Sequence, residues 1–458
     1  MRQPLWPQRR GTRHWLRLGI PAASGLALRL VFAVGVHQPT PPRGCAVDPR
    51  WFRQQAALLV RGHLFVDPCA ALRGSFVPGA NHPPLFSALL AFADLAGLRS
   101  MDAQRALLAV VSSSAVVLSA LVAREVGGRR AEVPAAWAAA LLPGMWVFGA
   151  QVISETLVVP LVAATVLVAL RMHRSPRMVT AVGLGVLCAL AALARTELAV
   201  LGVVFAPLFV RKLDWRRRIG QSAAYSAAIV LLVGPWVGRN IAYFRRPELV
   251  SVQLGATMAG GACKESFYGP SIGTWQVACT TLHDPHVVTS DASVQDYALR
   301  DRAISYTRHH LGRLGAVVAA REARAFEVWP RQLNSAVWDL LAAGGWPLWA
   351  GWLYHDVSMI TLPLWLATLW WLRRKRARTW ILLAPIGLYA FVSGVLSSDS
   401  RYSSDCQACF AVLIGVGIAA AWAWTFDRGP LLPPRAPRPS PSTSTSRIPA
   451  RGAPGVRP

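Results

Sequence analysis

The chain alternates long apolar runs with short polar turns along most of its length. Most of these runs have roughly 17 to 20 residues, enough for a helix to cross a bilayer core of about 30 Å. The pattern predicts an all-α polytopic membrane protein with roughly ten transmembrane helices. The expected spans are residues 16–36, 103–123, 133–150, 153–171, 178–194, 196–210, 219–238, 355–372, 380–397 and 407–425.

Two long polar interruptions break this pattern, a first loop at about 37–102 and a second at about 239–354. Basic clusters occupy other turns, at residues 124–130, 171–177, 211–218 and 373–378. All of them fall on the cytoplasmic side if the short apolar segment 83–98 does not cross the membrane. We therefore expect 83–98 to be an interfacial or re-entrant helix. Both termini are then cytoplasmic, and both long loops are outer loops.

The two ends of the chain differ from the middle. Residues 1–15 are basic, and the apolar run after them contains Arg29 and no small-x-small cleavage site, which favours an uncleaved signal anchor. Residues 16–425 are expected to form one transmembrane domain. Residues 429–458 are rich in Pro, Ser and Arg and predict a disordered cytoplasmic tail. The Trp-rich segment 336–353 lies at the interface or adds membrane helix, so the number of spans stays open.

The charge balance changes this picture little. Lys and Arg number 48 against 22 Asp and Glu, which gives a formal net charge of +26. In a soluble protein this excess would indicate a nucleic-acid partner. Here 53% of residues are hydrophobic and 15% charged, and the membrane topology accounts for the basic clusters. We expect membrane lipids around the chain and no nucleic acid.

Four of the seven cysteines fall in the two outer loops, Cys45 and Cys69 in the first and Cys263 and Cys279 in the second. In an oxidising compartment the disulfides Cys45–Cys69 and Cys263–Cys279 can form, and free thiols are the alternative. The cysteines lack the spacing of a structural zinc site.

The second outer loop contains two segments of interest. Residues 311–330 can form an amphipathic helix, with Leu311 on one side and Arg321 and Arg324 on another. Such a helix lies on the membrane surface or is an ordinary helix of a domain within the loop. Earlier in the loop, GGACKESFYGPSIGTW supplies Lys264, Tyr268 and a glycine-rich backbone able to approach a ligand closely.

The first outer loop carries the strongest candidates for chemistry. Asp48-Pro49 reads as a helix start, with Asp as the cap and Pro at the first helical position. The same carboxylate would stand at the mouth of a membrane site, on a helix that Trp51 and Phe52 anchor at the interface. His82 begins a stiff HPP segment, where it either starts a helix or offers its ring to an anionic group.

Charged residues also flank several later spans. Arg195 and Glu197 lie in a short turn between two apolar runs. Ionisable groups near the membrane interior cost free energy, so these two either form an ion pair with each other or have a functional role. Glu155, at the start of another span, is a similar case. Arg239 and Arg401 lie beside spans on the outer side, against the positive-inside trend, which favours an anionic partner such as a phosphate.

Taken in order, these residues resemble the GT-C glycosyltransferases of family 39, which include protein O-mannosyltransferases and the bacterial aminoarabinose transferase of lipid A. The similarity is strongest to the actinobacterial branch and covers about residues 16–425. It is carried by Asp48 with the aromatic residues after it, then HPPLF, SET, ARTE, PWVGRN, YGPSIGTW and an RY pair before the last span.

The resemblance implies a GT-C fold and a hexosyl- or pentosyltransferase of the cell envelope, located in the plasma membrane. The donor would be a sugar on a polyprenyl phosphate, and the acceptor a hydroxyl of an extracytoplasmic protein, lipid or polysaccharide. Asp48 would act as general base, with inversion at the anomeric carbon. The expected donor-phosphate ligands are His82, Arg239, Arg401 and Lys264. The expected supports of the substrate site are Glu155, Arg195, Glu197 and Tyr268.

The chain departs from the family pattern at several positions. Pro49 replaces a second acidic residue found in some relatives, His82 stands where others have lysine, and Ser403 replaces a second arginine in the last motif. The donor sugar therefore stays open. Because arginines can stabilise the leaving phosphate and no DxD-like site is present, we expect no metal cofactor. A transporter or lipid flippase, although no inverted repeat is visible, and an inactive scaffold relative remain alternatives.

Overall fold

The computed structural model describes residues 12–36, 45, 47–209, 214–282, 291–330, 347–375, 379–398 and 400–427. The predicted tail 429–458, the first eleven residues and most of the segment 336–353 lie outside these ranges. The described residues form helices and two isolated β-bridges but no strand, which confirms the all-α prediction.

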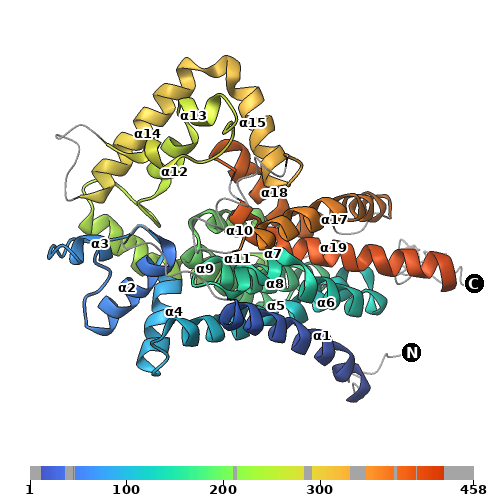
Figure 1. The fold of residues 1–458 in the computed structure, drawn as a ribbon. Coiled ribbons are helices and arrows are strands. Elements are labelled where there is room, and N and C mark those ends of the chain that lie inside the picture. Colours follow the sequence, from blue (N-terminus) through green and yellow to red (C-terminus); the bar gives the residue numbers. More distant parts are fainter. Residues whose placement is uncertain are drawn as a thin grey trace, which may run out of the picture.

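Helices of widely different length follow one another along the chain (Figure 1). In the first half they are α1 (Thr12–Leu30, continued by a π-helical turn Val31–Gly35), α2 (Asp48–Val60), α3 (Pro68–Ala71), α4 (Pro84–Leu95), α5 (Met101–Gly127), α6 (Glu132–Leu141), α7 (Pro143–Trp146), α8 (Glu155–Arg174), α9 (Met178–Ala194) and α10 (Ala199–Val204). In the second half they are α11 (Trp215–Tyr243), α12 (Leu254–Gly261), α13 (Lys264–Phe267), α14 (Ala292–His309), α15 (Leu311–Ala325), α17 (Leu348–Arg374), α18 (Thr379–Val395) and α19 (Ser404–Trp422).

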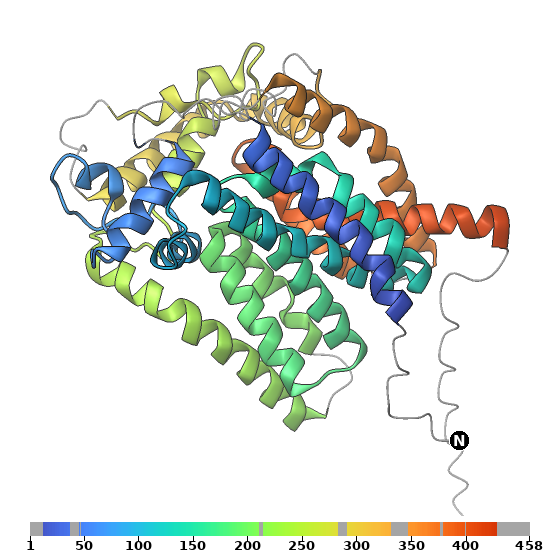
Figure 2. The same ribbon diagram turned by 60° about the horizontal axis from the view of Figure 1, so that its bottom comes forward.

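The long apolar helices pack side by side into one bundle, which Figure 2 shows from below. α5 lies against α6 and α8, α19 against α6 and α8, and α9 between α8 and α11. Many of the buried positions in this core are alanine, such as Ala120, Ala135 and Ala163, and small side chains allow membrane helices to approach closely. The start of α1 and the end of α19 lie at the same end of the bundle (Figure 1).

Five described helices are long and apolar enough to cross a membrane, or six if a bent pair counts as one span. Several predicted spans form shorter apolar helices, namely Met178–Ala194, Thr196–Phe209 and Thr379–Val395. The membrane nature of the chain is clear, while the predicted count of ten spans stays a prediction. α4 has 12 residues and is about 18 Å long, shorter than a bilayer core, and the expected non-crossing placement of 83–98 stays a prediction.

The span predicted at 133–150 is not one straight helix. α6 ends at Leu141, and the chain from Pro143 to Ala150 turns away by 67°. Pro143 lacks the backbone N–H that would continue the helical ladder, and its ring clashes with the preceding turn. The fully buried Arg29 of α1 sits at the bend, where it donates to the carbonyl oxygens of Met145 at 2.9 Å and Ala139 at 3.4 Å. An arginine inside the predicted first span therefore completes the backbone hydrogen bonding at this break.

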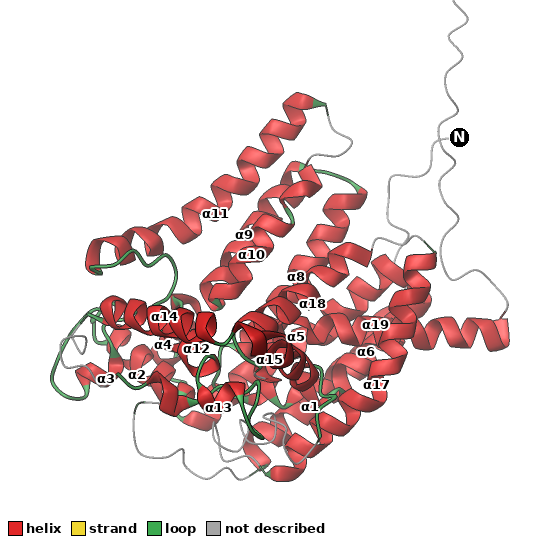
Figure 3. Ribbon diagram, turned by 90° about the horizontal axis from the view of Figure 1, so that it is seen from above, coloured by secondary structure: helices red, strands yellow, loops and turns green. Residues whose placement is uncertain are grey.

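The second outer loop forms an arch of helices, α12 to α15, over one side of the bundle (Figures 1 and 3). Arg321 of α15 donates to the carbonyl oxygens of Gly394 and Val395, both at 2.9 Å, and thereby fastens the arch to the end of α18. Arg324 donates to the carbonyl oxygens of Ile272 and Pro270. Both arginines are buried, whereas Leu311 is 61% exposed. The arginine side of 311–330 thus packs into the loop domain, as in an ordinary domain helix, and contact of its exposed apolar side with the membrane surface stays a prediction.

Candidate active site

Asp48 is the first residue of α2, but it does not cap the helix. The carbonyl oxygen of Val47 accepts the first helical hydrogen bonds, from the amides of Arg50 and Trp51, and Val47 is the N-cap residue. Pro49 occupies the second helical position, and no side chain caps this end. The cap assignment made from the Asp-Pro pair is therefore corrected. The carboxylate of Asp48 is available for contacts outside its own helix.

Those contacts join the first outer loop to the start of the last span. Nη1 of Arg401, in the 3₁₀ turn Ser400–Ser403 before α19, donates to Oδ2 of Asp48 at 2.8 Å across 353 residues of sequence. Nε2 of His82 lies 3.9 Å from Oδ1 of the same carboxylate. The side chain of Asp48 keeps 28% of its surface exposed, so the carboxylate remains accessible.

His82 is held in place by aromatic rings. Its imidazole lies 4.6 Å from the ring of Trp51 and 4.6 Å from the ring of Phe52, and Phe52 packs in turn against Phe86. Trp51 and Phe52 are 6% and 1% exposed, so they form the wall of the site and do not anchor α2 at an interface. The Cys45–Cys69 disulfide closes the loop just before α2.

Arg195, the C-cap of α9, is the second cation of the site. It donates to Oε1 of Glu155, the first residue of α8, at 2.7 Å and to Oε1 of Glu197 at 2.5 Å. Its guanidinium lies 4.5 Å from the ring centre of Tyr402, next to Arg401. The structure thus brings together the ARTE turn, the SET motif and the RY motif, which lie far apart in the sequence.

Asp405 belongs to the same cluster and was missed by the sequence reasoning. It lies in the first turn of α19, is 1% exposed, and interacts electrostatically with Arg195, Glu155 and Glu197. Its Oδ1 has no hydrogen-bond partner among the described residues. An acidic residue at the start of an apolar span is the signal that marks such a position, since ionisable groups at that depth are costly.

The pKa values of Asp48 and His82 are both lowered from their ordinary values. Burial alone would raise the pKa of Asp48, but Arg401, and to a smaller extent His82 and Arg195, lower that pKa below its ordinary value. Burial lowers the pKa of His82, and Arg195 and Arg401 act in the same direction while Asp48 opposes them. At neutral pH Asp48 is therefore an ionised carboxylate, and His82 is a neutral imidazole.

Two predicted phosphate ligands, Arg239 and Lys264, and one predicted support of the site, Tyr268, lie elsewhere. Nη2 of Arg239 donates to the carbonyl oxygen of Phe65 at 2.6 Å, and its guanidinium stacks on Trp236 at 5.1 Å. Phe65 has a left-handed backbone with φ of 51°, so Arg239 secures a strained turn of the first outer loop. Lys264 is exposed at the start of α13, and Tyr268 contacts Arg313. The structure shows Arg239, Lys264 and Tyr268 in contacts outside the Asp48 cluster.

The glycine-rich stretch of the second outer loop packs against protein. A Cβ on Gly260 would collide with the indole of Trp275, and one on Gly261 with the carbonyl oxygen of Leu396. These two glycines therefore permit close packing of the backbone, whereas a Cβ on Gly269 of the same stretch would meet nothing within 4 Å, so open backbone remains there.

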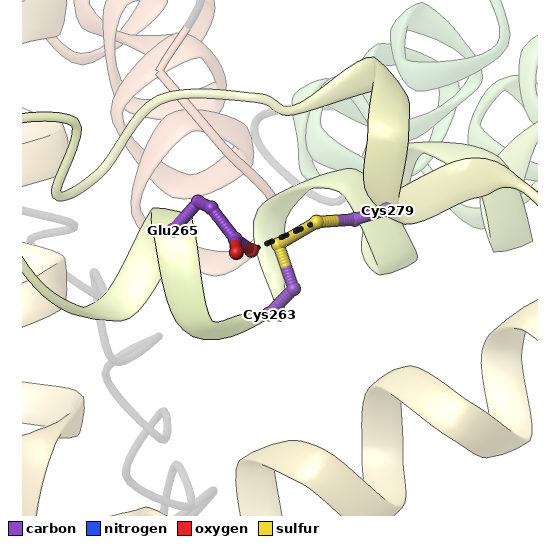
Figure 4. Close-up of side chains that lie close together, drawn as sticks. All are labelled: Cys263, Glu265 and Cys279. Carbon is purple, nitrogen blue, oxygen red and sulfur yellow. Dashed lines mark hydrogen bonds between the residues drawn. A yellow bond between two sulfur atoms is a disulfide. The ribbon is translucent and has the colours of Figure 1, made fainter.

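The second outer loop also contains a group of sulfur and carboxylate atoms close enough together to hold a metal ion (Figure 4). In the structure Cys263 and Cys279 form a disulfide, and Glu265 lies 3.4 Å from the sulfur of Cys279. Disulfide sulfurs are not thiolates and bind metal poorly, so in this oxidised form the group is a covalent staple of the loop.

Comparison with known proteins supports the fold assignment. Residues 81–237 match the sequence model of the family described as dolichyl-phosphate-mannose-protein mannosyltransferase. The archaeal oligosaccharyltransferase AglB from Archaeoglobus fulgidus, solved with an inhibitory peptide and a dolichol-phosphate, is 13% identical with a TM-score of 0.53. That match covers 90% of this chain and 51% of AglB. The chain thus spans about half the length of AglB.

Two further solved structures are similar. The Archaeoglobus fulgidus oligosaccharyltransferase in complex with Zn and sulfate is 13% identical, with a TM-score of 0.50 over 89% of this chain and 49% of that one. ArnT from Cupriavidus metallidurans bound to undecaprenyl phosphate is 14% identical, with a TM-score of 0.41 over 90% of this chain and 80% of ArnT. A search of curated protein sequences finds no match. The resemblance is thereby confirmed: the chain has the GT-C glycosyltransferase fold, and its residues 81–237 match the dolichyl-phosphate-mannose-protein mannosyltransferase family.

Proposed function

We propose that this protein is a membrane glycosyltransferase that transfers a sugar from a polyprenyl-phosphate donor to an acceptor hydroxyl outside the cytoplasm. The observation that carries the proposal is the accessible carboxylate of Asp48, held 2.8 Å from Arg401 at the end of an apolar bundle. The family match, and a fold neighbour solved with a dolichol-phosphate and a peptide, support this donor class.

In this proposal Asp48 is the general base. It accepts the proton of the acceptor hydroxyl while the hydroxyl oxygen forms a bond to the anomeric carbon of the sugar. The bond from that carbon to the phosphate oxygen breaks, and the polyprenyl phosphate leaves with the electron pair. Attack from the face opposite the phosphate inverts the anomeric configuration.

Arg401 and Arg195 supply the positive charge for the leaving phosphate. Arg401 is one-fifth exposed beside Asp48, and Arg195 is fixed by Glu155 and Glu197 behind it. Guanidinium groups that are already in place stabilise the developing negative charge without rearrangement. We accordingly propose a reaction that needs no metal ion, which predicts full activity in excess EDTA.

The proposed orientation places both termini in the cytoplasm and the two outer loops outside, in the plasma membrane. The site then meets the donor phosphate at the outer surface of the bilayer. A maleimide that cannot cross membranes should label a cysteine introduced at the exposed Lys264 in intact cells. One introduced at the exposed Arg217 should stay unlabelled until the cells are opened.

The deciding experiment compares wild type with Asp48→Asn in detergent. Radiolabelled mannose or arabinose on undecaprenyl phosphate is offered with a peptide, a lipid extract and a cell-wall polysaccharide. We expect transfer to fall roughly 100- to 10,000-fold in Asp48→Asn, the usual contribution of a general base. Asp102→Asn is the matched control, since Asp102 is 67% exposed at the start of α5.

Equal rates in Asp48→Asn and wild type would overturn the assignment of the base. Folded wild-type protein that transfers sugar from neither donor would instead favour a transporter, a lipid flippase or an inactive scaffold.

A further inference from the structure

The two oxygens of the Asp48 carboxylate have different surroundings. Oδ2 accepts the hydrogen bond from Arg401 at 2.8 Å. Oδ1 faces Nε2 of His82 at 3.9 Å, and the described part of the chain provides no hydrogen bond to it. A separation of 3.9 Å is too long for a direct hydrogen bond. The Oδ1 side of the carboxylate thus faces Nε2 of His82 across a gap of 3.9 Å.

This gap has the right width for one oxygen atom. Hydrogen bonds to a hydroxyl oxygen measure about 2.7 to 3.0 Å, so an oxygen can lie within bonding distance of both Oδ1 and Nε2 when these are 3.9 Å apart. With the tautomer of His82 that carries its proton on Nε2, a hydroxyl there donates its proton to Asp48 and accepts from the imidazole N–H, which satisfies both of its hydrogen-bonding roles.

His82 suits a hydroxyl better than a phosphate. Burial lowers the pKa of His82, so the ring is neutral at neutral pH and offers one N–H without a positive charge. The cations that could stabilise a phosphate are on other elements: Arg401, before α19, donates to Asp48, and Arg195, at the end of α9, interacts electrostatically with Asp48. Trp51 and Phe52 each hold the imidazole at 4.6 Å, which keeps the Nε2 atom in one position.

We propose that the acceptor hydroxyl binds between Oδ1 of Asp48 and Nε2 of His82, so that His82 orients the acceptor and is not a donor-phosphate ligand. This inference rests on the proposed glycosyl transfer. The hydroxyl proton passes to Oδ1, the freed electron pair attacks the anomeric carbon, and the phosphate leaves on the side of Arg401. One carboxylate therefore separates the two substrates, with its Oδ1 toward the acceptor and its Oδ2 toward the donor.

Three variants of His82 test this placement. His82→Phe keeps a ring between Trp51 and Phe52 but removes the N–H, His82→Gln returns a neutral N–H, and His82→Lys supplies a positive charge. Initial rates are measured against donor and acceptor concentration, with the acceptor that wild type uses best. Binding of undecaprenyl phosphate is measured separately.

We expect His82→Phe to lower kcat/KM for the acceptor roughly 3- to 10-fold, the value of one hydrogen bond. Its donor KM and its binding of undecaprenyl phosphate should match wild type, which also shows that the variant is folded. His82→Gln should recover part of the loss. By contrast, Arg401→Gln should weaken binding of undecaprenyl phosphate.

The inference is overturned if His82→Phe weakens binding of undecaprenyl phosphate and His82→Lys restores it, since His82 would then be a phosphate ligand. An unchanged kcat/KM for the acceptor in His82→Phe also overturns it. These results differ from failure of the proposed function, in which wild type itself transfers no sugar, and that result overturns both proposals.

Discussion

Arginines in two regions of this molecule, the bend between α6 and α7 and the Asp48 cluster, are neutralised in different ways. At the bend between α6 and α7, Arg29 is surrounded by backbone carbonyl oxygens and lies wholly inside the bundle. In the Asp48 cluster, Arg195 and Arg401 pair with carboxylates, and the carboxylate of Asp48 is accessible. An arginine that completes backbone hydrogen bonds serves the fold. An arginine beside an accessible carboxylate lowers the pKa of that carboxylate. The same guanidinium can also bind an anionic ligand in place of the carboxylate.

After replacement of Asp48 itself, the largest effect should come from removing Arg401, the cation beside the proposed base. Arg401→Gln is expected to lower transfer roughly 100- to 1,000-fold, the cost of one group that stabilises charge in a transition state. The pH profile should change as well. The pKa of Asp48 is held low by Arg401 against the opposing effect of burial, so without the guanidinium it rises.

Because the base must be ionised, the acid side of the kcat profile should move to higher pH in Arg401→Gln. Arg401→Lys keeps the charge and should move it less. An acid side that stays in place in Arg401→Gln would show that Arg401 does not set the basicity of Asp48.

A smaller effect is expected from opening the first outer loop. The Cys45–Cys69 disulfide joins residues 24 apart, and closing a loop of this size contributes about 3 kcal/mol in the chain-entropy model. Cys69→Ser should therefore increase hydrogen exchange in α2 and lower kcat, because α2 carries Asp48. Cys279→Ser, which opens the other disulfide, is the matched control and should leave exchange in α2 unchanged. Equal effects of both changes would mean that the Cys45–Cys69 bond does not specifically support the site.

The smallest effect on catalysis should come from the other region. Arg29→Met leaves buried carbonyl groups without a donor, which should lower the free energy of unfolding by about 1 to 3 kcal/mol. Transfer per folded molecule should stay within roughly 2-fold of wild type, because Arg29 stabilises the bend between α6 and α7 and does not contact the Asp48 cluster. Thermal unfolding and active-site titration measure the two quantities. Arg17→Met, at an exposed position of the same helix, is the control. A catalytic defect in folded Arg29→Met protein would remove the distinction between the two regions.

The sequence predicted the parts of this molecule whose signals are local. Apolar runs gave the helices, and ordered short motifs indicated the GT-C fold. Those motifs also named Asp48, Arg401, Arg195 and Glu155, which the structure brings into one cluster. Which of these residues contact one another could not be predicted from local sequence patterns, because partners such as Asp48 and Arg401 are 353 residues apart.

The failures have physical causes that involve distant partners. The Asp-Pro pair does start a helix, but Val47 is the N-cap residue, so the Asp48 side chain makes tertiary contacts and does not cap the helix. The apolar run 133–150 gave no sign that Arg29 on another helix would support a break at Pro143. The sequence placed Arg321 and Arg324 on the polar side of a helix but gave no sign that this side is buried, because the carbonyl groups that accept from them belong to other segments.

The ion pair between Asp48 and Arg401 also has a consequence for biosynthesis. Its two halves lie near opposite ends of the chain, on the first outer loop and at the entry of the last span. While the ribosome is still producing the intervening helices, the carboxylate has no Arg401 to tune it. The proposed base thus gains its Arg401 partner only when the final helix has been inserted, so we expect nascent or truncated chains to be inactive.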